Sequence, residues 1–235
     1  MSIQEHVDQV RAHIAAAARS AGRDPEEITL CAATKVQSDS TIREAIAAGI
    51  TVCGENRVQE LTAHLAADAY RGAQVHFIGH LQTNKVKQVV GRVSLIHSVD
   101  SEHLLRAIEA QAAKQDLVQD ILLEVNIAGE ESKGGCTPDQ AGALALLTRE
   151  LPHVRLRGLM AIPPISPEPG ANRPYFAAMR QLFVDIKANM GDNQDNMDCL
   201  SMGMSGDYPD AIAEGATLVR VGTALFGPRP PMHRA

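Results

Sequence analysis

The chain has 235 residues, of which 45% are hydrophobic and 21% are charged, a mixture typical of a globular protein with a substantial core. The net charge is −6, only 3% of the residues are aromatic and there is no tryptophan, so the composition argues against nucleic acid as a partner. The sequence has no apolar run of about 18 residues, and segment 1–22 is not a signal peptide, so we expect a cytoplasmic protein without membrane contact.

The first 22 residues predict an amphipathic helix, because Ile3, Val7, Val10 and Ile14 form a narrow apolar stripe. After this helix, short apolar runs alternate with amphipathic helical stretches. The runs are rich in Val, Ile and Leu, as is typical of parallel strands that are covered by helices. Eight of them predict strands: 28–34, 51–54, 75–79, 93–99, 120–127, 154–162, 197–203 and 217–222.

Seven helical stretches separate the predicted strands. They cover residues 40–49, 56–69, 81–91, 101–115, 138–151, 174–191 and 207–215. Several begin at residues that cap helices well, namely Ser38 or Asp39, Ser101, and Thr137 before Pro138. The alternation of strands and helices therefore follows one pattern from end to end.

Eight strands, seven intervening helices and one preceding helix predict an α/β fold, a single (β/α)8 TIM barrel domain over residues 1–235. A doubly wound open sheet is the structural alternative. No linker rich in Pro, Gly and Ser divides the chain, and its longest loop is 163–174. The four cysteines are far apart and the nine histidines have no metal-ligand spacing, so we expect buried thiols and no metal.

Glycines and hydroxyl residues gather where the last two predicted strands end. The segment "SMGMSGD" contains Gly203, Ser205 and Gly206, and "RVGTALFG" contains Gly222 and Thr223. The loops after strands seven and eight are where barrels most often bind phosphate, through backbone N–H groups and a short helix N-terminus. The two segments predict a phosphate site, with tight turns and capping hydroxyls as the structural alternative.

Lys35 ends the first predicted strand, in "ITLCAATKVQ", where a buried run gives way to a loop. An amine at such a position loses hydration, which lowers the pKa of a lysine and frees it to attack carbonyl groups. A lysine whose stem packs at the barrel rim is the structural alternative. With a phosphate site in the same mouth, Lys35 favours an aldehyde-bearing phosphate ligand, either pyridoxal phosphate or the sugar phosphate of a class I aldolase.

Arg220 precedes Gly222 by two residues, so both are expected to point to the same side of the eighth strand and into the barrel. A fixed cation that faces a pyridine nitrogen keeps that nitrogen unprotonated. The electron sink that most pyridoxal enzymes reinforce with a carboxylate is then weakened. A salt bridge with Glu55 or Glu124 inside the barrel is the alternative role of Arg220.

Other polar residues near the strand ends give weaker signals. Asn56 either hydrogen-bonds a ring oxygen of the ligand or caps its helix, and Met160 either lies under a ring or packs in the core. His80 in a polar mouth is more typical of a structural residue than of an acid or base. Lys85 and Lys133 leave open a second, looser cofactor site.

Six segments, in this order along the chain, resemble one known family. They are "AATK", "CGENRVQE", "HFIGHLQTNK", "GLMAIPP", "LSMGMSGDYPDAI" and "VRVGTALFG". These segments are very similar to those of the pyridoxal phosphate homeostasis proteins, from about Ile28 to Gly227. The family resembles the barrel domain of bacterial alanine racemase without its second domain. The resemblance therefore implies a barrel of the alanine racemase N-terminal type with an extra N-terminal helix.

The resemblance also implies roles for individual residues. Lys35 would form a Schiff base with pyridoxal phosphate, and Arg220 would face the pyridine nitrogen. Asn56 and Met160 would flank the cofactor ring. The phosphate cup would consist of Ser205, Gly222 and Thr223, with backbone from Met204.

The family is regarded as a cofactor carrier and regulator of vitamin B6 and amino-acid pools. We therefore favour a non-catalytic pyridoxal phosphate reservoir that supplies apo enzymes, and we predict no catalytic residue. An amino-acid racemase is the alternative, but it needs a second acid or base opposite Lys35, and the chain ends shortly after the eighth strand. Scarce aromatic residues and the lack of an obvious apolar patch favour a monomer.

Overall fold

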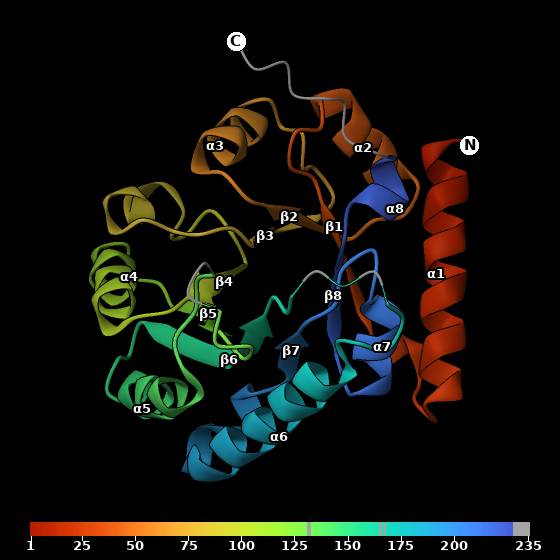
Figure 1. The fold of residues 1–235 in the computed structure, drawn as a ribbon. Helices are drawn as coiled ribbons and strands as arrows, with labels where there is room; N and C mark the ends of the chain where they lie inside the picture. The colour runs from red at the N-terminus through yellow and green to blue at the C-terminus, as the bar shows by residue number, and fades with distance from the viewer. Residues whose placement is uncertain (131–132, 165, 167, 228–235) are drawn as a thin grey trace.

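The computed structural model describes residues 1–130, 133–164, 166 and 168–227. It contains a closed barrel of eight parallel strands, surrounded by helices (Figure 1). Each strand pairs with the next in chain order, and β1 pairs with β8, which closes the barrel. The strands are β1 Thr29–Ala33, β2 Val52–Glu55, β3 Gln74–Phe77, β4 Leu95–Val99, β5 Gln119–Val125, β6 Val154–Ala161, β7 Cys199–Ser201 and β8 Leu218–Val221. The predicted barrel is confirmed, and the open sheet is excluded.

The helices follow the predicted order around the barrel. They are α1 Ile3–Ser20, α2 Asp39–Ala47, α3 Val58–Ala66, α4 Glu102–Lys114, α5 Pro138–Thr148, α6 Arg173–Asn189, α7 Tyr208–Ala213 and α8 Thr223–Phe226. Ser38, Ser101 and Thr137 cap α2, α4 and α5 through their side-chain oxygens, as predicted. Helix α1 lies outside the ring beside α7 and α8 (Figure 1). Its Val7 and Val10 are buried, which anchors the extra helix on the barrel.

One predicted helix is wrong in type. Segment 81–91 forms only a short 3-10 helix, η2 Thr83–Gln88, between β3 and β4. The β-branched residues Thr83, Val86 and Val89 lower the helix propensity of this segment, so it takes the tighter turn. Two further 3-10 helices, η1 Pro25–Glu27 and η3 Gly191–Asn196, connect longer elements.

The end of the first strand also differs from the prediction. Strand β1 ends at Ala33, and Lys35 lies in the turn that follows it. The Thr34 N–H still donates to the Gly54 carbonyl at 2.9 Å. Val36 then adopts a left-handed backbone with φ 60°, which turns the chain away from the sheet.

The interior of the barrel is filled by two small apolar clusters with polar groups between them. One cluster consists of Cys31, Val52, Ile78 and Leu218, and the other of Leu95, Leu122 and Met160. The buried polar side chains beside them include His76, His97, Ser201 and Arg220. Since buried polar groups need hydrogen-bond partners, this core has a defined polar arrangement as well as an apolar one.

Two properties of the described ranges bear on function. No helix there is long and apolar enough to cross a membrane. No group of three or more His, Cys, Asp or Glu side chains in the same ranges could hold a metal ion. The four cysteines are free thiols, and all but Cys199 are buried.

Candidate functional site

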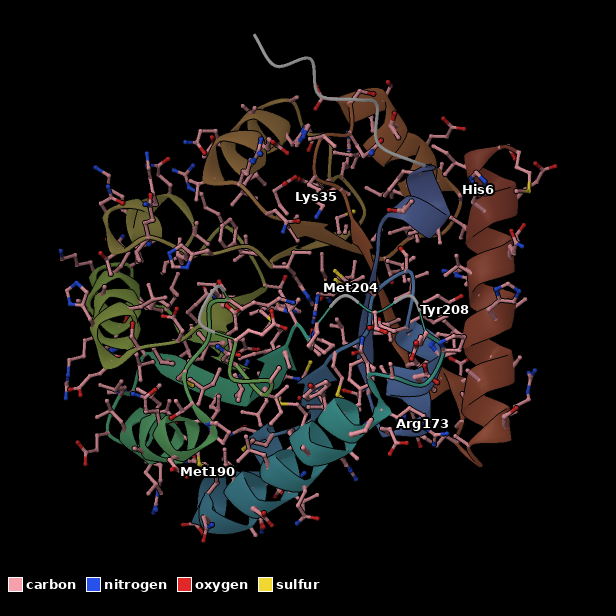
Figure 2. All side chains as sticks on the ribbon, in the orientation of Figure 1. His6, Lys35, Arg173, Met190, Met204 and Tyr208 are labelled. Carbon is pink, nitrogen blue, oxygen red and sulfur yellow. The ribbon has the colours of Figure 1, made fainter. Side chains whose placement is uncertain are left out.

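A pocket of about 460 Å³ lies at the carboxyl ends of the strands, and we call it the carboxyl-terminal pocket. The predicted site residues that line it are Lys35, Asn56, Met204, Ser205, Arg220, Gly222 and Thr223. They come from the ends of β1, β2, β7 and β8, which are far apart in sequence. Lys35 and Met204 both lie inside the ring of helices, whereas His6 lies on α1 outside it (Figure 2). The fold thus brings together all the predicted site residues except Met160.

Lys35 is presented by a strained turn. Ala33 and Lys35 line the pocket two residues apart, so the alternation of β1 continues past the end of the strand. Val36 has φ 60°, which is unfavourable for a β-branched residue. The Val36 N–H donates to the Glu60 carboxylate on α3 at 2.9 Å, and this bond holds the turn in place. Backbone strain of this kind is common at functional sites.

The ends of β7 and β8 form a cup of backbone N–H groups. The Ser205 hydroxyl accepts hydrogen bonds from the N–H groups of Gly222, at 3.2 Å, and Ala224, at 3.3 Å. These N–H groups lie where α8 begins, at the positive end of its backbone dipoles. A side chain at Gly206 would meet nothing within 4 Å, so the cup opens into free space there. The two N–H groups hold the Ser205 oxygen, and the Ser205 hydrogen remains available to an oxyanion in this space.

The loop that carries Met204 and Ser205 is held from behind by Asp207. Its carboxylate accepts from the Met204 N–H at 2.7 Å and from the Asn172 side-chain amide at 2.8 Å. Gly203 has φ 91°, and a Cβ there would lie 2.6 Å from Ala211 Cβ, so the close packing of the loop on α7 requires glycine. The supporting role of Asn172 was not evident in the sequence because it starts a distant helix.

Arg220 points into the barrel, as its alternation with Gly222 predicts, and is 4% exposed. Its guanidinium donates to the Ser201 carbonyl at 2.9 Å and to the Ala161 carbonyl at 2.8 Å. Within the residues that the structure describes it forms no ion pair, so the salt bridge to Glu55 or Glu124 is not observed. Burial lowers the pKa of Arg220 from its ordinary value, and the negative charge of Glu124 opposes this effect.

Glu55 lies behind the pocket wall and fixes Asn56. Its carboxylate accepts from the Asn56 N–H at 2.8 Å, the Tyr70 hydroxyl at 3.0 Å and the Thr34 hydroxyl at 3.3 Å. Burial raises the pKa of Glu55, and the bonds from Asn56 and Tyr70 oppose that shift. Among the described residues, the buried Asn56 side-chain oxygen has no hydrogen-bond partner, so the wall offers an unsatisfied amide to a ligand.

Met160 does not reach the pocket surface. It is fully buried, and Ile162, two residues further along the chain, lines the pocket instead. The same period of two that placed Arg220 and Gly222 on one side would have identified Ile162. The other apolar lining residues that the sequence reasoning did not single out are Ala33, Val36, Ile78 and Phe226.

The remaining polar candidates fall on different sides of the pocket boundary. Lys133 lines the pocket, and its amine donates to the Pro163 carbonyl at 2.8 Å. His80 is exposed, and neither His80 nor Lys85 is among the lining residues. Of the two lysines considered for a looser site, only Lys133 is therefore in a position to meet a ligand here.

The closed barrel and the position of its pocket define a (β/α)8 barrel protein with its site at the carboxyl ends of the strands. The model of the family "alanine racemase, N-terminal domain" matches residues 6–230. A pyridoxal phosphate homeostasis protein of Aquifex aeolicus is 44% identical over 229 residues, which are 97% of this chain and 99% of that protein. The chain belongs to the alanine racemase N-terminal domain family and, within it, to the pyridoxal phosphate homeostasis proteins.

Two solved structures are similar over nearly their full length. An unknown protein from Bifidobacterium adolescentis has a TM-score of 0.88 and 39% identity, covering 95% of this chain and 94% of that one. PipY of Synechococcus elongatus PCC7942, solved with PLP bound, has a TM-score of 0.83 and 33% identity. The similarity covers 96% of this chain and 100% of PipY.

Proposed function

We propose that this protein binds pyridoxal 5′-phosphate in the carboxyl-terminal pocket and acts in intracellular vitamin B6 homeostasis by holding and supplying it. One observation carries the proposal: Lys35, the backbone cup around Ser205 and the buried Arg220 line the same pocket. The cup would hold the phosphate, Lys35 the aldehyde, and Arg220 would face the pyridine nitrogen. The bound cofactor supplies an aldehyde that reacts reversibly with amines.

The residues present fit this group. A pocket of about 460 Å³ lies within the range of small-molecule sites. The unsatisfied Asn56 side-chain oxygen is available to accept a hydrogen bond from a ring hydroxyl, and the open space at Gly206 leaves room at the cup. PipY, which is 33% identical to this chain, was solved with PLP bound, and this supports the same ligand here.

We further propose that the protein is a non-catalytic carrier. Racemisation requires a second acid or base opposite the lysine. Within the described part of the chain, the lining contains no Tyr, His, Cys, Asp or Glu, and the Lys133 amine is bound to Pro163. The fixed cation of Arg220 would also keep the pyridine nitrogen unprotonated, which weakens the cofactor as an electron sink. The relatives that match along nearly their whole length are named as homeostasis proteins, which supports a carrier over the racemase alternative.

The organisation of the protein remains part of the proposal. We propose that residues 1–235 form one pyridoxal phosphate-binding domain that works as a cytoplasmic monomer. Apo enzymes that need pyridoxal phosphate would be its acceptors. Residues 228–235, the end of this domain, lie outside the described residues.

The test is an absorption spectrum of the purified protein with pyridoxal phosphate, beside Lys35→Ala and Lys85→Ala. Lys85 is the matched control because it is a nearby lysine that does not line the pocket. We expect a band at the violet edge of the visible range that is lost in Lys35→Ala and kept in Lys85→Ala. A band that survives in Lys35→Ala would refute the role of Lys35.

The carrier function is tested by transfer. Holo protein is mixed with several apo pyridoxal phosphate enzymes, and recovery of their activity is compared with recovery in free pyridoxal phosphate at the same concentration. We expect recovery in mixtures where the free cofactor has been trapped by a competing amine. Failure with every acceptor would contradict the carrier function. Loss of α-deuterium from any amino acid of a panel would favour the racemase.

A further inference from the structure

A chain of hydrogen bonds runs through the barrel interior from Arg220 to the opposite end of the strands. Arg220 donates to the Ser201 hydroxyl, and the Ser201 oxygen lies 3.0 Å from His97 Nδ1. His97 Nε2 lies 3.0 Å from His76 Nδ1. Ser201 and His97 are fully buried and His76 is 5% exposed, so none of these three bonds is shared with bulk solvent. The sequence reasoning identified only Arg220 among these four residues.

The hydrogen-bond chain has one direction in which every polar atom from Ser201 Oγ to His76 Nδ1 is satisfied. Arginine only donates, so the Ser201 oxygen accepts from Arg220 and its hydrogen is left to donate to His97 Nδ1. His97 then carries its proton on Nε2 and donates to His76 Nδ1. His76 in turn carries its proton on Nε2. In the reverse direction the Ser201 hydrogen has no acceptor among the described residues, at a fully buried position.

Charge and burial keep both rings neutral, which this arrangement requires. Burial lowers the pKa of His76 to about 4, and the positive charge of Arg157 adds to the effect. Burial also lowers the pKa of His97 well below its ordinary value, with contributions from His76 and Arg220. Each ring therefore has one ring-nitrogen proton at neutral pH, and the direction of the hydrogen-bond chain sets which nitrogen carries it.

We propose that Ser201, His97 and His76 are positioning residues that fix the guanidinium of Arg220 at the carboxyl-terminal pocket. This inference rests on the proposed function, since the purpose of the orientation is to hold a cation against the pyridine nitrogen. The two carbonyl partners of Arg220 set two of its N–H directions. The bond to Ser201 Oγ adds a further direction, and the bond between this hydroxyl and His97 holds the oxygen in place toward the guanidinium.

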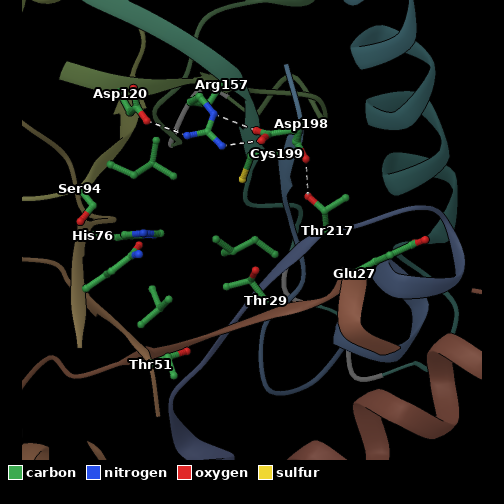
Figure 3. Close-up of a pocket in the computed structure, with 14 residues that line it drawn as sticks. Glu27, Thr29, Thr51, His76, Ser94, Asp120, Arg157, Asp198, Cys199 and Thr217 are labelled. Atoms are coloured by element: carbon green, nitrogen blue, oxygen red, sulfur yellow. Dashed lines mark hydrogen bonds and ion pairs between the residues drawn. The ribbon is translucent and has the colours of Figure 1, made fainter. Parts of the chain in front are cut away.

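The far end of the chain opens into a second pocket, which we call the amino-terminal pocket. It has about 370 Å³ and is lined by residues at the starts of the strands, His76 among them (Figure 3). Among the described residues, the His76 ring hydrogen-bonds through Nδ1 only, and its Nε2 is left for the pocket. The direction of the chain makes this atom a donor, so it needs an acceptor from the contents of the pocket. The nearby Asp120 carboxylate, which raises the pKa of His76, favours a proton on this side of the ring.

The first experiment tests the direction of the chain without cofactor. The ¹⁵N spectra of the histidine rings are recorded for the apo protein, Ser201→Ala and Ser98→Ala. Ser98 is the matched control, because it is a fully buried serine next to His97 whose hydroxyl has no partner among the described residues. We expect Nε2–H tautomers at His76 and His97 in the wild type and in Ser98→Ala, and a mixture in Ser201→Ala. Nδ1–H tautomers or charged rings at pH 7 would overturn the proposal.

The second experiment tests the link to the cofactor, with His97→Asn and His97→Phe. Asparagine can keep an acceptor near the position of Nδ1 for Ser201, whereas phenylalanine fills the space without one. We expect His97→Phe to bind pyridoxal phosphate about tenfold more weakly with a shifted absorption band, and His97→Asn to remain close to the wild type. If His97→Phe bound pyridoxal phosphate as tightly as His97→Asn and with the same absorption band, the positioning role would be overturned.

The outcomes separate this inference from the proposed function. If the wild type binds no pyridoxal phosphate, the proposed function fails even where the tautomers are as expected. If the wild type binds it but the tautomers are reversed, only the positioning chain fails. Should His97→Phe not fold, Ser201→Ala provides the same comparison, with a shifted band and weaker binding expected against Ser98→Ala.

Discussion

The two ends of the barrel each hold a polar pocket with an arginine, but the two arginines have different hydrogen-bond partners. In the amino-terminal pocket, Arg157 pairs with Asp120 at 2.7 Å and with Asp198, so the cation is satisfied by the protein itself (Figure 3). In the carboxyl-terminal pocket, Arg220 is held by neutral oxygens only, in the part of the chain that is described. Beside Arg220, the cup contains the Ser205 hydroxyl, whose oxygen accepts from two backbone N–H groups.

This difference shows how charge balance separates structure from binding in one fold. Where ion pairs are closed within the protein, an added anion gains little, and the groups act to hold strand starts together. Where a cation and a hydroxyl donor lack a carboxylate, an anionic ligand completes the site. The division agrees with the general pattern of these barrels, in which the carboxyl ends of the strands carry function and the other end carries stability.

The largest effect that we expect comes from Lys35→Ala in the carboxyl-terminal pocket. Loss of the covalent link should weaken retention of pyridoxal phosphate on the order of 1,000-fold, about 4 kcal/mol. Stability of the apo protein should change by less than about 0.5 kcal/mol, because Lys35 lies in a turn at the pocket rim. Retention is measured by gel filtration and absorbance, and stability by urea unfolding. Undiminished retention would remove the distinction between the two pockets.

Acid should act through the histidine chain that joins the pockets. Unfolded histidines bind protons near pH 6.5, whereas His76 and His97 resist protonation in the folded state. The unfolded state then binds more protons, so the free energy of unfolding should fall as pH drops from 6.5 towards about 4, by about 3 kcal/mol for His76 alone. Urea unfolding across this range measures the fall.

A variant without the two buried histidines of the hydrogen-bond chain isolates this effect. Burial raises the pKa of Glu55 and Glu124, so their contribution has the opposite sign and is lost as pH rises above 4.5. The double variant His76→Gln with His97→Asn keeps both glutamates and should lose the fall in stability below pH 6.5. An unchanged pH profile in that variant would show that the histidines are not its source.

Breaking the closed ion pairs should affect the other pocket alone. Arg157→Met leaves Asp120 and Asp198 without their shared partner, and we expect a loss of stability of about 2 kcal/mol, reduced because the Arg157 side chain is 32% exposed. The affinity for pyridoxal phosphate should stay within about a factor of two of the wild type, and the absorption band should keep its position. The opposite pattern, weaker binding with unchanged stability, would contradict the division of roles.

Removal of one hydroxyl from the cup should have a smaller effect on binding. Ser205→Ala loses the oxygen that accepts from Gly222 and Ala224 and that a phosphate group would neighbour. We expect binding of pyridoxal phosphate to weaken about fivefold, near 1 kcal/mol. Binding of pyridoxal without phosphate should hardly change. Equal losses for both ligands would argue that Ser205 acts on the fold rather than on the phosphate.

The smallest predicted change concerns the strain beside Lys35. Asparagine tolerates a positive φ better than valine does, so Val36→Asn should raise the stability of the apo protein by about 0.5 to 1 kcal/mol. The Glu60 bond to this N–H is kept, so any change in pyridoxal phosphate binding should come from the loss of the apolar Val36 side chain that lines the pocket. A thermal melt and a binding titration together measure both quantities. A lower melting temperature would mean that the valine side chain stabilises the turn.

Sequence reasoning could identify residues that depend on local pattern. The eight apolar runs predicted the barrel, and the glycines and hydroxyl groups of "SMGMSGD" and "RVGTALFG" predicted the cup, because backbone demands leave a mark on nearby residues. The alternation of Arg220 with Gly222 predicted the inward side of β8 correctly. Lys35 was found because a lysine beside a buried run is uncommon.

Long-range partners could not be read from the chain. His97 and Ser201 are 104 residues apart, and Asn172 reaches Asp207 across 35 residues, so no local spacing marks either pair. Met160 looked like a residue for the pocket wall, but the register of β6 buries it and brings Ile162 to the surface. Segment 81–91 was predicted to be a helix because it lies between two strands, although its residues have weak helix propensity.

The sequence by itself determined the barrel, the family and the residue types at the carboxyl ends of the strands. These depend on hydrophobic period and backbone conformation, which act over a few residues. Tertiary structure alone decided which charges are closed in ion pairs, which donors remain for a ligand, and that a buried chain of Ser201, His97 and His76 stands behind Arg220. The reason is physical: strand register and barrel closure set the distances between residues that are remote in the chain, and electrostatics follows those distances.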